Sequence, residues 1–220
     1  MPDLPADSAR ILARHGPVVA AYKPSGMQVH PANDSADPDL CAWLAAQPDL
    51  PEGLTPVHRL DKEASGLVLC AASAEERAEV GGWFARGEIH KVYLALVFGH
   101  AHKKGTIRRP LHDARRRRPL EATTRYHLEE ALGGFSLLRV EPETGRKHQI
   151  RRHLHGIGLP IVGDDEHRPG RYLRMPAYPG RLWLHAWKLV LPDGTELEAP
   201  LPPELVANLE ALRAGAAVRG

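Results

Sequence analysis

The feature that most constrains the fold is the order in which strand-like and helix-like segments follow one another. Short runs rich in β-branched and aromatic residues, which are typical of strands, are interspersed with segments of helical character. The expected strands are 17–22, 65–72, 91–98, 122–128, 135–141, 182–191 and 195–199, and the expected helices are 40–47, 73–87, 147–155 and 203–213. Because no regular strand–helix–strand repeat occurs, this order predicts an α+β fold with a mixed, mostly antiparallel sheet.

Local signals support several of these boundaries. Ser73 followed by Glu76 is a capping-box pattern, so a helix is expected to begin there and to run toward Gly87. Gly133-Gly134 and Pro192-Asp193-Gly194 each separate two strand-like runs, as expected for hairpins. The sequence contains neither GxGxxG nor GxxxxGK[ST], which argues against dinucleotide and P-loop nucleotide binding.

Composition limits the class of protein. Of the 220 residues, 43% are hydrophobic and 25% are charged, as in globular domains. No apolar run approaches the ~20 residues that span a bilayer, and the first residues lack the apolar region of a secretory signal. Two cysteines, Cys41 and Cys70, are too few for a disulfide framework or a four-cysteine zinc site, and both are expected to be small buried residues. We therefore expect a cytoplasmic protein without a membrane partner.

Charge is segregated along the chain, although the net charge is only +2. Residues 86–118 contain ten Lys and Arg against two acidic residues, and residues 146–182 contain eight against three. Two basic blocks in a nearly neutral chain indicate a surface that faces nucleic acid. Two solvated basic loops are the alternative.

Two polar segments are candidates for chemistry. His58-Arg59-Leu60-Asp61 precedes a strand and is expected to be a loop held by rigid neighbours; a surface ion pair between Arg59 and Asp61 is the alternative. In the second segment, 144–154, a helix would bring several cations onto adjacent faces, namely His148, Arg151, Arg152 and His155. Cations near a helix N-terminus oppose its dipole. A helix that contacts RNA or phosphate, with one Arg left for an internal partner, therefore explains this segment better than a solvated face.

The histidines of this region raise the question of a metal site. His148, His153 and His155 are followed by Asp164-Asp165-Glu166-His167. Their spacing matches neither HExxH nor a zinc-finger pattern, so no metal ligand is expected. A metal hydrolase is the contrasting interpretation, and it predicts inhibition by chelators.

Four segments occur in an order that is more specific than any one of them. They are Lys23–Pro31 (KPSGMQVHP), His58–Leu67 (HRLDKEASGL), Lys91–Ala95 (KVYLA), and Thr144–Leu154 (TGRKHQIRRHL) with Pro160–Asp164 (PIVGD). Together they resemble the RluA family of RNA pseudouridine synthases, over about residues 18–200. The amino-acid sequence of residues 144–154 is most similar to that of the tRNA-modifying branch of that family. Ala64 departs from the Thr that the family usually has before Ser-Gly.

The resemblance implies an isomerase that moves the base of an RNA uridine from an N1 to a C5 glycosidic bond, without cofactor or metal. It implies a curved sheet with flanking helices and a central active-site cleft. The matched catalytic residue is Asp61, with Arg151 as the cation that keeps it ionised. Tyr93 matches the ring that holds the detached uracil or moves a proton, and apolar packing in a strand is the alternative. A carboxylate suits this chemistry because breaking a glycosidic bond develops positive charge on the ribose.

The resemblance also implies that the target base is flipped out of an RNA fold. Arg59 is expected to fill the vacated stack or to touch the neighbouring backbone. The other residues expected to bind substrate are His58, Arg146, Lys147, His148, Arg115, Arg116 and Arg117. The last three belong to the basic segment, residues 102–119, which is expected to be a mobile loop that holds RNA backbone. A disordered, solvated loop without a role is the alternative.

Domain organisation and substrate complete the expectations. We expect an N-terminal extension over 1–16, a catalytic domain over 17–202 and a C-terminal helix and tail over 203–220, in a monomer without a separate RNA-binding domain. The favoured substrate is tRNA, with rRNA second. The alternative function is an inactive RNA-binding or ribosome-assembly protein on the same fold, and the intact set Asp61, Tyr93 and Arg151 argues against it.

Overall fold

The computed structural model describes residues 8–31, 37–112, 118–167 and 175–217. The chain divides into two compact units. Unit 1 comprises residues 1–90 and 186–201, and unit 2 comprises residues 91–185 and 202–220. No helix within the described ranges is long and apolar enough to cross a membrane. The extension, catalytic domain and tail expected from the sequence stay a prediction.

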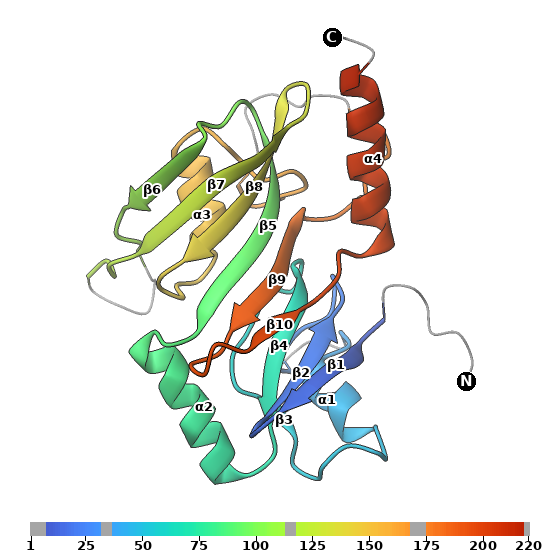
Figure 1. Ribbon diagram of the computed structural model, residues 1–220, viewed down its shortest axis with the longest axis vertical. Coiled ribbons are helices and arrows are strands. Elements are labelled where there is room, and N and C mark those ends of the chain that lie inside the picture. The colour runs from blue at the N-terminus through green and yellow to red at the C-terminus, as the bar shows by residue number, and fades with distance from the viewer. Residues whose placement is uncertain (1–7, 32–36, 113–117, 168–174, 218–220) are drawn as a thin grey trace. The chain divides into compact units, whose positions relative to one another are not determined.

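Unit 1 is built on antiparallel strand pairs (Figure 1). β1 (Arg10–His15) pairs with β2 (Val18–Lys23), β2 pairs with β4 (Ser65–Ala71), and the short β3 (Thr55–Pro56) also pairs with β4. The last part of β9 (Leu184–Val190) belongs to unit 1 and pairs with β10 (Glu196–Glu198), which confirms the expected hairpin. β1 was not expected, and it lies within the segment assigned to an N-terminal extension.

Two helices complete unit 1, α1 (Leu40–Ala45) and α2 (Ala74–Arg86). α2 begins at the expected capping box, in which Ser73 Oγ accepts the N–H of Glu76 and the Glu76 carboxylate accepts the N–H of Ser73. It ends where Gly87 adopts a left-handed φ of 72°. The core lies between α2 and the sheet, with Val80 of the helix packed among apolar residues of β2 and β4, which include Tyr22, Leu67 and Leu69.

The two cysteines of unit 1 differ in exposure. Cys70 is buried in β4, as expected, and burial together with the nearby Cys41 raises the pKa of its thiol to about 12. Cys41 is only half-buried, so the expectation of a buried side chain was wrong for this residue.

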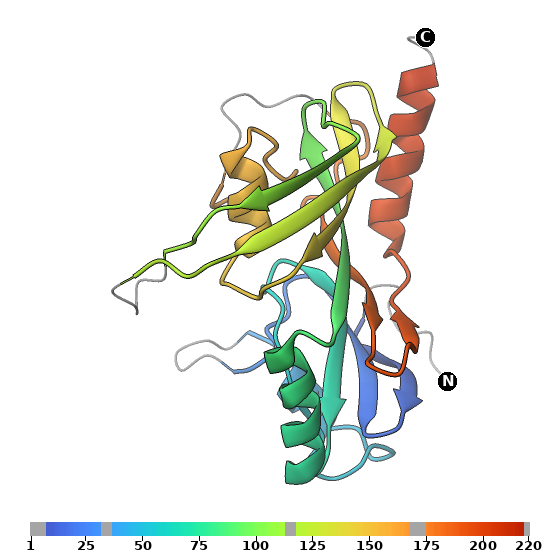
Figure 2. The same ribbon diagram turned by 60° about the vertical axis from the view of Figure 1, so that its left-hand side comes forward.

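Unit 2 contains an antiparallel sheet. Its strands lie in the order β5 (His90–Phe98), β8 (Phe135–Pro142), β7 (Thr123–Ala131) and β6 (Lys104–Arg108). The helix α3 (Gln149–Gly156) packs on one face against β7 and β8 (Figures 1 and 2). The helix α4 (Pro203–Ala217) is attached where the indole N–H of the buried Trp183 donates to Asn208 Oδ1, at 3.0 Å.

The structure corrects the expectation that the whole basic segment is a mobile loop. Residues 104–108 form β6, in which Gly105 lies opposite Tyr126 of β7. The ring of Tyr126 covers this glycine so closely that a Cβ there would lie 2.5 Å from it. Lys and Gly have low strand propensity, so the sequence of β6 does not resemble a strand. Pairing with β7 outweighs that local preference.

The expected fold class is otherwise confirmed: the described chain is α+β with mostly antiparallel pairing. Several helix ends differ by a few residues from the expected ones, and the start of α3 differs for a clear reason: it begins at Gln149 rather than at Lys147. His148 adopts a left-handed φ of 50°, which is incompatible with a place inside the helix. The central cleft stays a prediction.

Candidate active site

The loop that carries Asp61 connects β3 to β4 in unit 1. Arg59 is exposed, Leu60 is buried and Asp61 is half-buried. The carbonyl of Asp61 accepts the N–H of Ala64 at 3.1 Å, which closes a tight turn at the aspartate. The loop therefore anchors itself through a buried leucine and leaves the neighbouring arginine in solvent.

His58 fastens the start of this loop to its surroundings. Its Nε2 accepts the backbone N–H of Leu69 in β4 at 2.9 Å, and its ring packs against Phe84 of α2 with centroids 4.6 Å apart. The Nε2 is thus used by the fold itself. A contact between His58 and the substrate stays a prediction.

A buried lysine holds the same loop from the opposite end. Lys23, at the end of β2, is 0% exposed, and its Nζ donates to four backbone carbonyls. The acceptors are Pro24 and Met27 (2.8 Å each), Lys62 (3.1 Å) and Ala64 (2.6 Å). A buried ammonium requires such acceptors, and two of them follow Asp61 within three residues. Lys23 stands in the KPSG motif, but its positioning role was not foreseen.

Two further hydrogen bonds complete this clamp on the loop. Ser25 Oγ donates to the carbonyl of Glu63 at 2.6 Å, and the N–H of Gly26 donates to the carbonyl of Lys62 at 2.9 Å. The carbonyls of residues 62, 63 and 64 are therefore all bound by the segment 23–26. The backbone that follows Asp61 is held by groups that the KPSG motif supplies.

The strand that follows the loop requires a glycine. Gly66 has a φ of +121°, and a Cβ there would lie 2.2 Å from the carbonyl oxygen of Ala186. No side chain can occupy that space, because the obstacle is backbone. The glycine of the Ser-Gly pair that follows the aspartate is thus explained by a close approach of two backbones.

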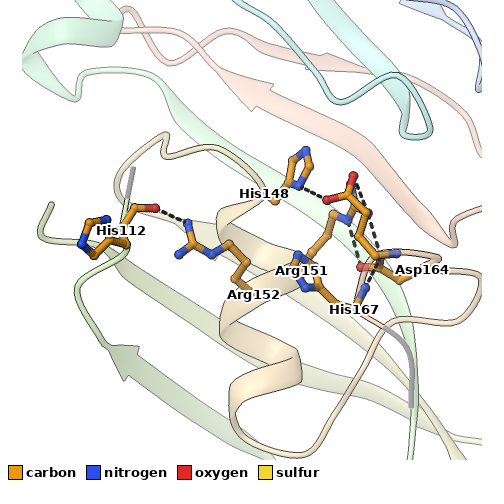
Figure 3. Close-up of polar contacts among 7 residues, drawn as sticks. His112, His148, Arg151, Arg152, Asp164 and His167 are labelled. Carbon is orange, nitrogen blue, oxygen red and sulfur yellow. Dashed lines mark hydrogen bonds and ion pairs between the residues drawn. The ribbon is translucent and has the colours of Figure 1, made fainter. Parts of the chain in front are cut away.

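In unit 2, Arg151 of α3 forms a buried ion pair with Asp164. Arg151 Nε lies 2.9 Å from Asp164 Oδ2 and Nη2 lies 2.7 Å from Oδ1, and the side chains are 2% and 0% exposed (Figure 3). This is the internal partner that the sequence led us to expect for one arginine of the helix. Its identity was missed: Asp164 closes the PIVGD segment, where the sequence pattern indicated no role for it. The pairing of Arg151 with Asp61 stays a prediction.

The electrostatics of Asp164 follow from its contacts. Burial disfavours the carboxylate, but the hydrogen bonds from Arg151 and from the backbone N–H groups of His167 and Glu166 outweigh that penalty. The pKa of Asp164 is therefore held below its ordinary value, and Asp164 stays ionised beside the guanidinium at neutral pH.

The turn after Asp164 brings two more polar side chains to the start of α3. Asp164 Oδ1 accepts the N–H groups of Glu166 and His167, at 3.0 Å each. Glu166 Oε2 lies 3.0 Å from His148 Nδ1, and Oε1 lies 3.7 Å from Arg151 Nη2. His148 and Arg151, both expected site residues, are thus brought together around one carboxylate.

The first residue of α3 anchors the helix to the sheet. Gln149 is 4% exposed, and its Nε2 donates to the carbonyl of Thr123 (2.9 Å) and to Thr124 Oγ1 (3.0 Å). Its Oε1 accepts the hydroxyl of Thr144 (2.6 Å) and the N–H of Arg146 (3.0 Å). These four bonds use both donors and both lone pairs of the amide. Gln149 therefore fastens the start of α3 to β7 and to the turn before the helix, a role that its place in the motif did not reveal.

The same helix holds the basic segment through two carbonyls. Arg152 Nη1 donates to the carbonyl of His112 at 3.0 Å (Figure 3), and His153 Nε2 lies 2.9 Å from the carbonyl of Arg109. Because a carbonyl only accepts, Nε2 of His153 carries the hydrogen, and Nδ1 accepts from Thr124 Oγ1 at 2.9 Å. Burial and the nearby Arg152 and Arg109 lower the pKa of His153 despite its carbonyl contact.

The remaining predicted site residues lie as follows. Tyr93 is half-buried in β5, opposite Val140 of β8. Arg146 and Lys147 are exposed before α3, and Arg118 is exposed. Arg115, Arg116 and Arg117 lie outside the described residues. Asp61 belongs to unit 1, whereas Tyr93 and Arg151 belong to unit 2, so their action as one catalytic set stays a prediction.

Known protein sequences resemble this chain over most of its length. Residues 17–156 match the family model described as RNA pseudouridylate synthase. An uncharacterized RNA pseudouridine synthase of Chloroflexus aurantiacus is 40% identical over 212 residues, which are 87% of this chain and 65% of the relative. Ribosomal large subunit pseudouridine synthase D of Nitrosomonas europaea is 34% identical over 230 residues, 93% of this chain and 65% of the relative. The chain thus spans just under two thirds of the length of these two relatives.

A further relative and a solved structure agree. The tRNA pseudouridine synthase C of Haemophilus ducreyi is 31% identical over 199 residues, 80% of this chain and 82% of the relative. The structure titled Human RNA Pseudouridylate Synthase Domain Containing 4 superposes with a TM-score of 0.76 at 26% identity and covers 92% of both chains. The resemblance of the four motifs, the match of the family model over 17–156 and this superposition lead to one conclusion: the chain belongs to the RNA pseudouridylate synthase family.

Proposed function

We propose that the protein isomerises a uridine in structured RNA to pseudouridine, with Asp61 as the catalytic carboxylate. The observation that carries this proposal is the clamp on the Asp61 loop, in which the backbone carbonyls of residues 62–64 are bound by Lys23, Ser25 and Gly26. A catalytic group must be held within a fraction of an ångström, and this loop is anchored far more firmly than a surface ion pair requires.

The chemistry follows from a carboxylate at the anomeric carbon. Cleavage of the bond between N1 and C1′ leaves positive charge on the ribose, which Asp61 stabilises or attacks, as the carboxylates of retaining glycosidases do. The detached uracil turns and C1′ bonds to C5. The hydrogen on C5 leaves as a proton and N1 ends protonated, so the reaction is an isomerisation without net loss of atoms.

Arg151 and Tyr93 have distinct roles in this proposal. Arg151 keeps Asp61 ionised, and the buried contact with Asp164 supports that role because it fixes the orientation of the guanidinium. Tyr93 provides a ring against which the free uracil stacks while it turns. A phenol hydroxyl at that position can also move the proton between C5 and solvent.

Exposed cations support RNA as the substrate class. Lys103, Lys104, Arg108 and Arg109 are exposed along β6 and its ends, and the hydrogen bonds to His153 and Arg152 hold the end of this segment against α3. We assign these cations to phosphate contacts and the exposed Arg59 to the stack vacated by the flipped base. Relatives named for tRNA and for the ribosomal large subunit both match the chain. We favour tRNA as the substrate because of the sequence of residues 144–154, and we keep rRNA as the second candidate.

The test uses RNA labelled with tritium at C5 of uridine, because only isomerisation releases that hydrogen to water. Total tRNA and rRNA from cells that lack the gene are each incubated with the purified chain, and the modified positions are then mapped. We expect tritium release at one or a few positions, with tRNA as the better substrate. Binding of these RNAs without any release would contradict the proposal and favour the inactive RNA-binding protein.

A further inference from the structure

Three side chains at the start of α3 have the donor types and the spacing of a metal site. They are His148, Glu166 and His167, and one ligand atom from each lies within 4.8 Å of the other two. His148 Nδ1 and Glu166 Oε2 are already 3.0 Å apart. Two ligands of a tetrahedral zinc ion, each about 2.0–2.1 Å from the metal, lie at a similar separation from one another. Two of the three donors are therefore close to a coordinating arrangement.

The imidazole of His167 supplies an independent observation. Its Nε2 is shielded from solvent and has no hydrogen-bond partner among the described residues. A buried polar nitrogen without a partner costs free energy, and each such group in a native protein calls for an explanation. A bound ion at this cluster provides one.

Hydrogen bonds and backbone conformation hold the chain on both sides of the cluster. Asp164 Oδ1 holds the N–H groups of both Glu166 and His167 (Figure 3), and Arg151 holds Asp164 in turn. On the other side, His148 has its left-handed φ of 50° directly before α3. Gly163 has a φ of +74°, and a Cβ there would lie 2.0 Å from the carbonyl oxygen of Arg181, so the turn that presents Glu166 and His167 allows no side chain at its start.

We propose that His148, Glu166 and His167 bind one divalent transition-metal ion, with Zn²⁺ as the best match. Two imidazole nitrogens and one carboxylate oxygen suit Zn²⁺ and its neighbours in the first transition row, whereas Mg²⁺ and Ca²⁺ prefer oxygen ligands. The remaining coordination position is open to water. The ion joins the start of α3 to the turn after Asp164.

The surroundings define what kind of site this is. Arg151 Nη2 lies 3.7 Å from Glu166 Oε1, so a positive charge stands next to the cluster. This charge lowers the affinity of the cluster for a cation. It also engages one oxygen of the Glu166 carboxylate, while the other oxygen faces His148. The bound ion is therefore an exchangeable accessory ion rather than a reaction cofactor. From the sequence, no metal ligand was expected in this region. Residue spacing alone does not show that His148, which lies before α3, meets Glu166 and His167, which lie in a turn after it.

The test measures metal binding by the full chain without RNA, after removal of any polyhistidine tag and treatment with a chelator. Co²⁺ is titrated while its visible absorption is recorded, and Zn²⁺ is then added in competition. We expect one Co²⁺ per chain, displaced by Zn²⁺, and an unfolding temperature that rises with Zn²⁺ concentration. In His167→Ala and Glu166→Gln, the affinity should fall at least tenfold.

The matched control is His155→Ala, because the ring of His155 lies 5.9 Å from that of His167 but belongs to no ligand set among the described residues. This variant should bind Co²⁺ like the unmodified chain. Circular dichroism of each metal-free variant checks that it is folded. Binding that survives both His167→Ala and Glu166→Gln, or no stoichiometric binding by the unmodified chain, would overturn the inference. The readout involves no RNA, so it is independent of the proposed function.

Discussion

Arg151 and Asp164 face one another in a buried, two-point ion pair, with Nε···Oδ2 at 2.9 Å and Nη2···Oδ1 at 2.7 Å. Planar pairs of this kind fix both partners in orientation as well as in distance. The pair therefore positions an arginine that we assign to the catalytic site, and it also holds the turn that carries Glu166 and His167.

The first prediction concerns the stability that depends on this pair. Asp164→Asn leaves the guanidinium of Arg151 buried without its counter-charge, which typically costs about 3–5 kcal/mol. The free energy of unfolding, measured by urea titration, should fall by about that amount. Asp165→Asn is the control, because this exposed neighbour should change the value by no more than about 0.5 kcal/mol. Equal effects of the two substitutions would contradict the claim that the ion pair between Arg151 and Asp164 stabilises the fold.

The second prediction concerns how the stability difference between the unmodified chain and Asp164→Asn depends on pH. The pKa of Asp164 is lowered in the folded state. The contribution of this carboxylate to the free energy of unfolding is therefore complete above its unfolded pKa of about 3.9. It is lost as the pH falls from there through the folded value. The stability gap between the unmodified chain and Asp164→Asn should therefore be constant near neutral pH and shrink in acid. A gap that widens as the pH falls would mean that the folded carboxyl binds protons more readily than the unfolded one.

The third prediction concerns the clamp on the Asp61 loop. Lys23→Met keeps an unbranched but slightly shorter side chain, and it leaves buried carbonyls unsatisfied, at about 1–3 kcal/mol for each group left unpaired. We expect lower stability and, in protein that remains folded, slower single-turnover isomerisation with little change in RNA affinity. Lys62→Met is the control, since the Lys62 ammonium pairs with Asp37 in a half-exposed position, and this variant should keep the rate. If Lys23→Met isomerised RNA as fast as the unmodified chain, the clamp would have no part in positioning Asp61.

Several of these features were predictable from sequence, because they depend on neighbouring residues. The capping box of α2 and the hairpin between β9 and β10 follow from local side chains and turn residues. β6 was missed because its strand identity comes from pairing with β7 and from the ring of Tyr126 over Gly105.

The partners of the site residues were missed for a similar reason. Asp164 is distant from Arg151 in the sequence, and nothing in the spacing shows that the turn after PIVGD returns to α3. Lys23 likewise binds carbonyls of residues 62 and 64. Such contacts depend on the path of the backbone, which a single sequence does not specify.

The fourth prediction concerns the exposed cations of β6 and of the residue just before it. Replacing Lys103, Lys104 and Arg108 together by Ala should weaken binding of any RNA. The slope of log affinity against log salt should become shallower by about 0.7–0.9 for each phosphate that the protein no longer neutralises. The single-turnover rate at saturating RNA should stay nearly unchanged. Lys188→Ala is the control, because Lys188 is paired with Glu196 and Glu198. An unchanged slope in the triple variant would show that these cations do not meet phosphates.

The last prediction tests the central claim that the carboxylate of Asp61 performs the isomerisation. Asp61→Asn keeps the shape of the side chain and removes its charge, and Glu63→Gln removes an exposed carboxylate from the same loop. The measurement is tritium release from C5-labelled RNA in a single turnover at saturating enzyme, beside RNA affinity. The account predicts no release above background for Asp61→Asn, with RNA still bound, and a normal rate for Glu63→Gln. Release by Asp61→Asn at about a tenth of the unmodified rate or faster would contradict it.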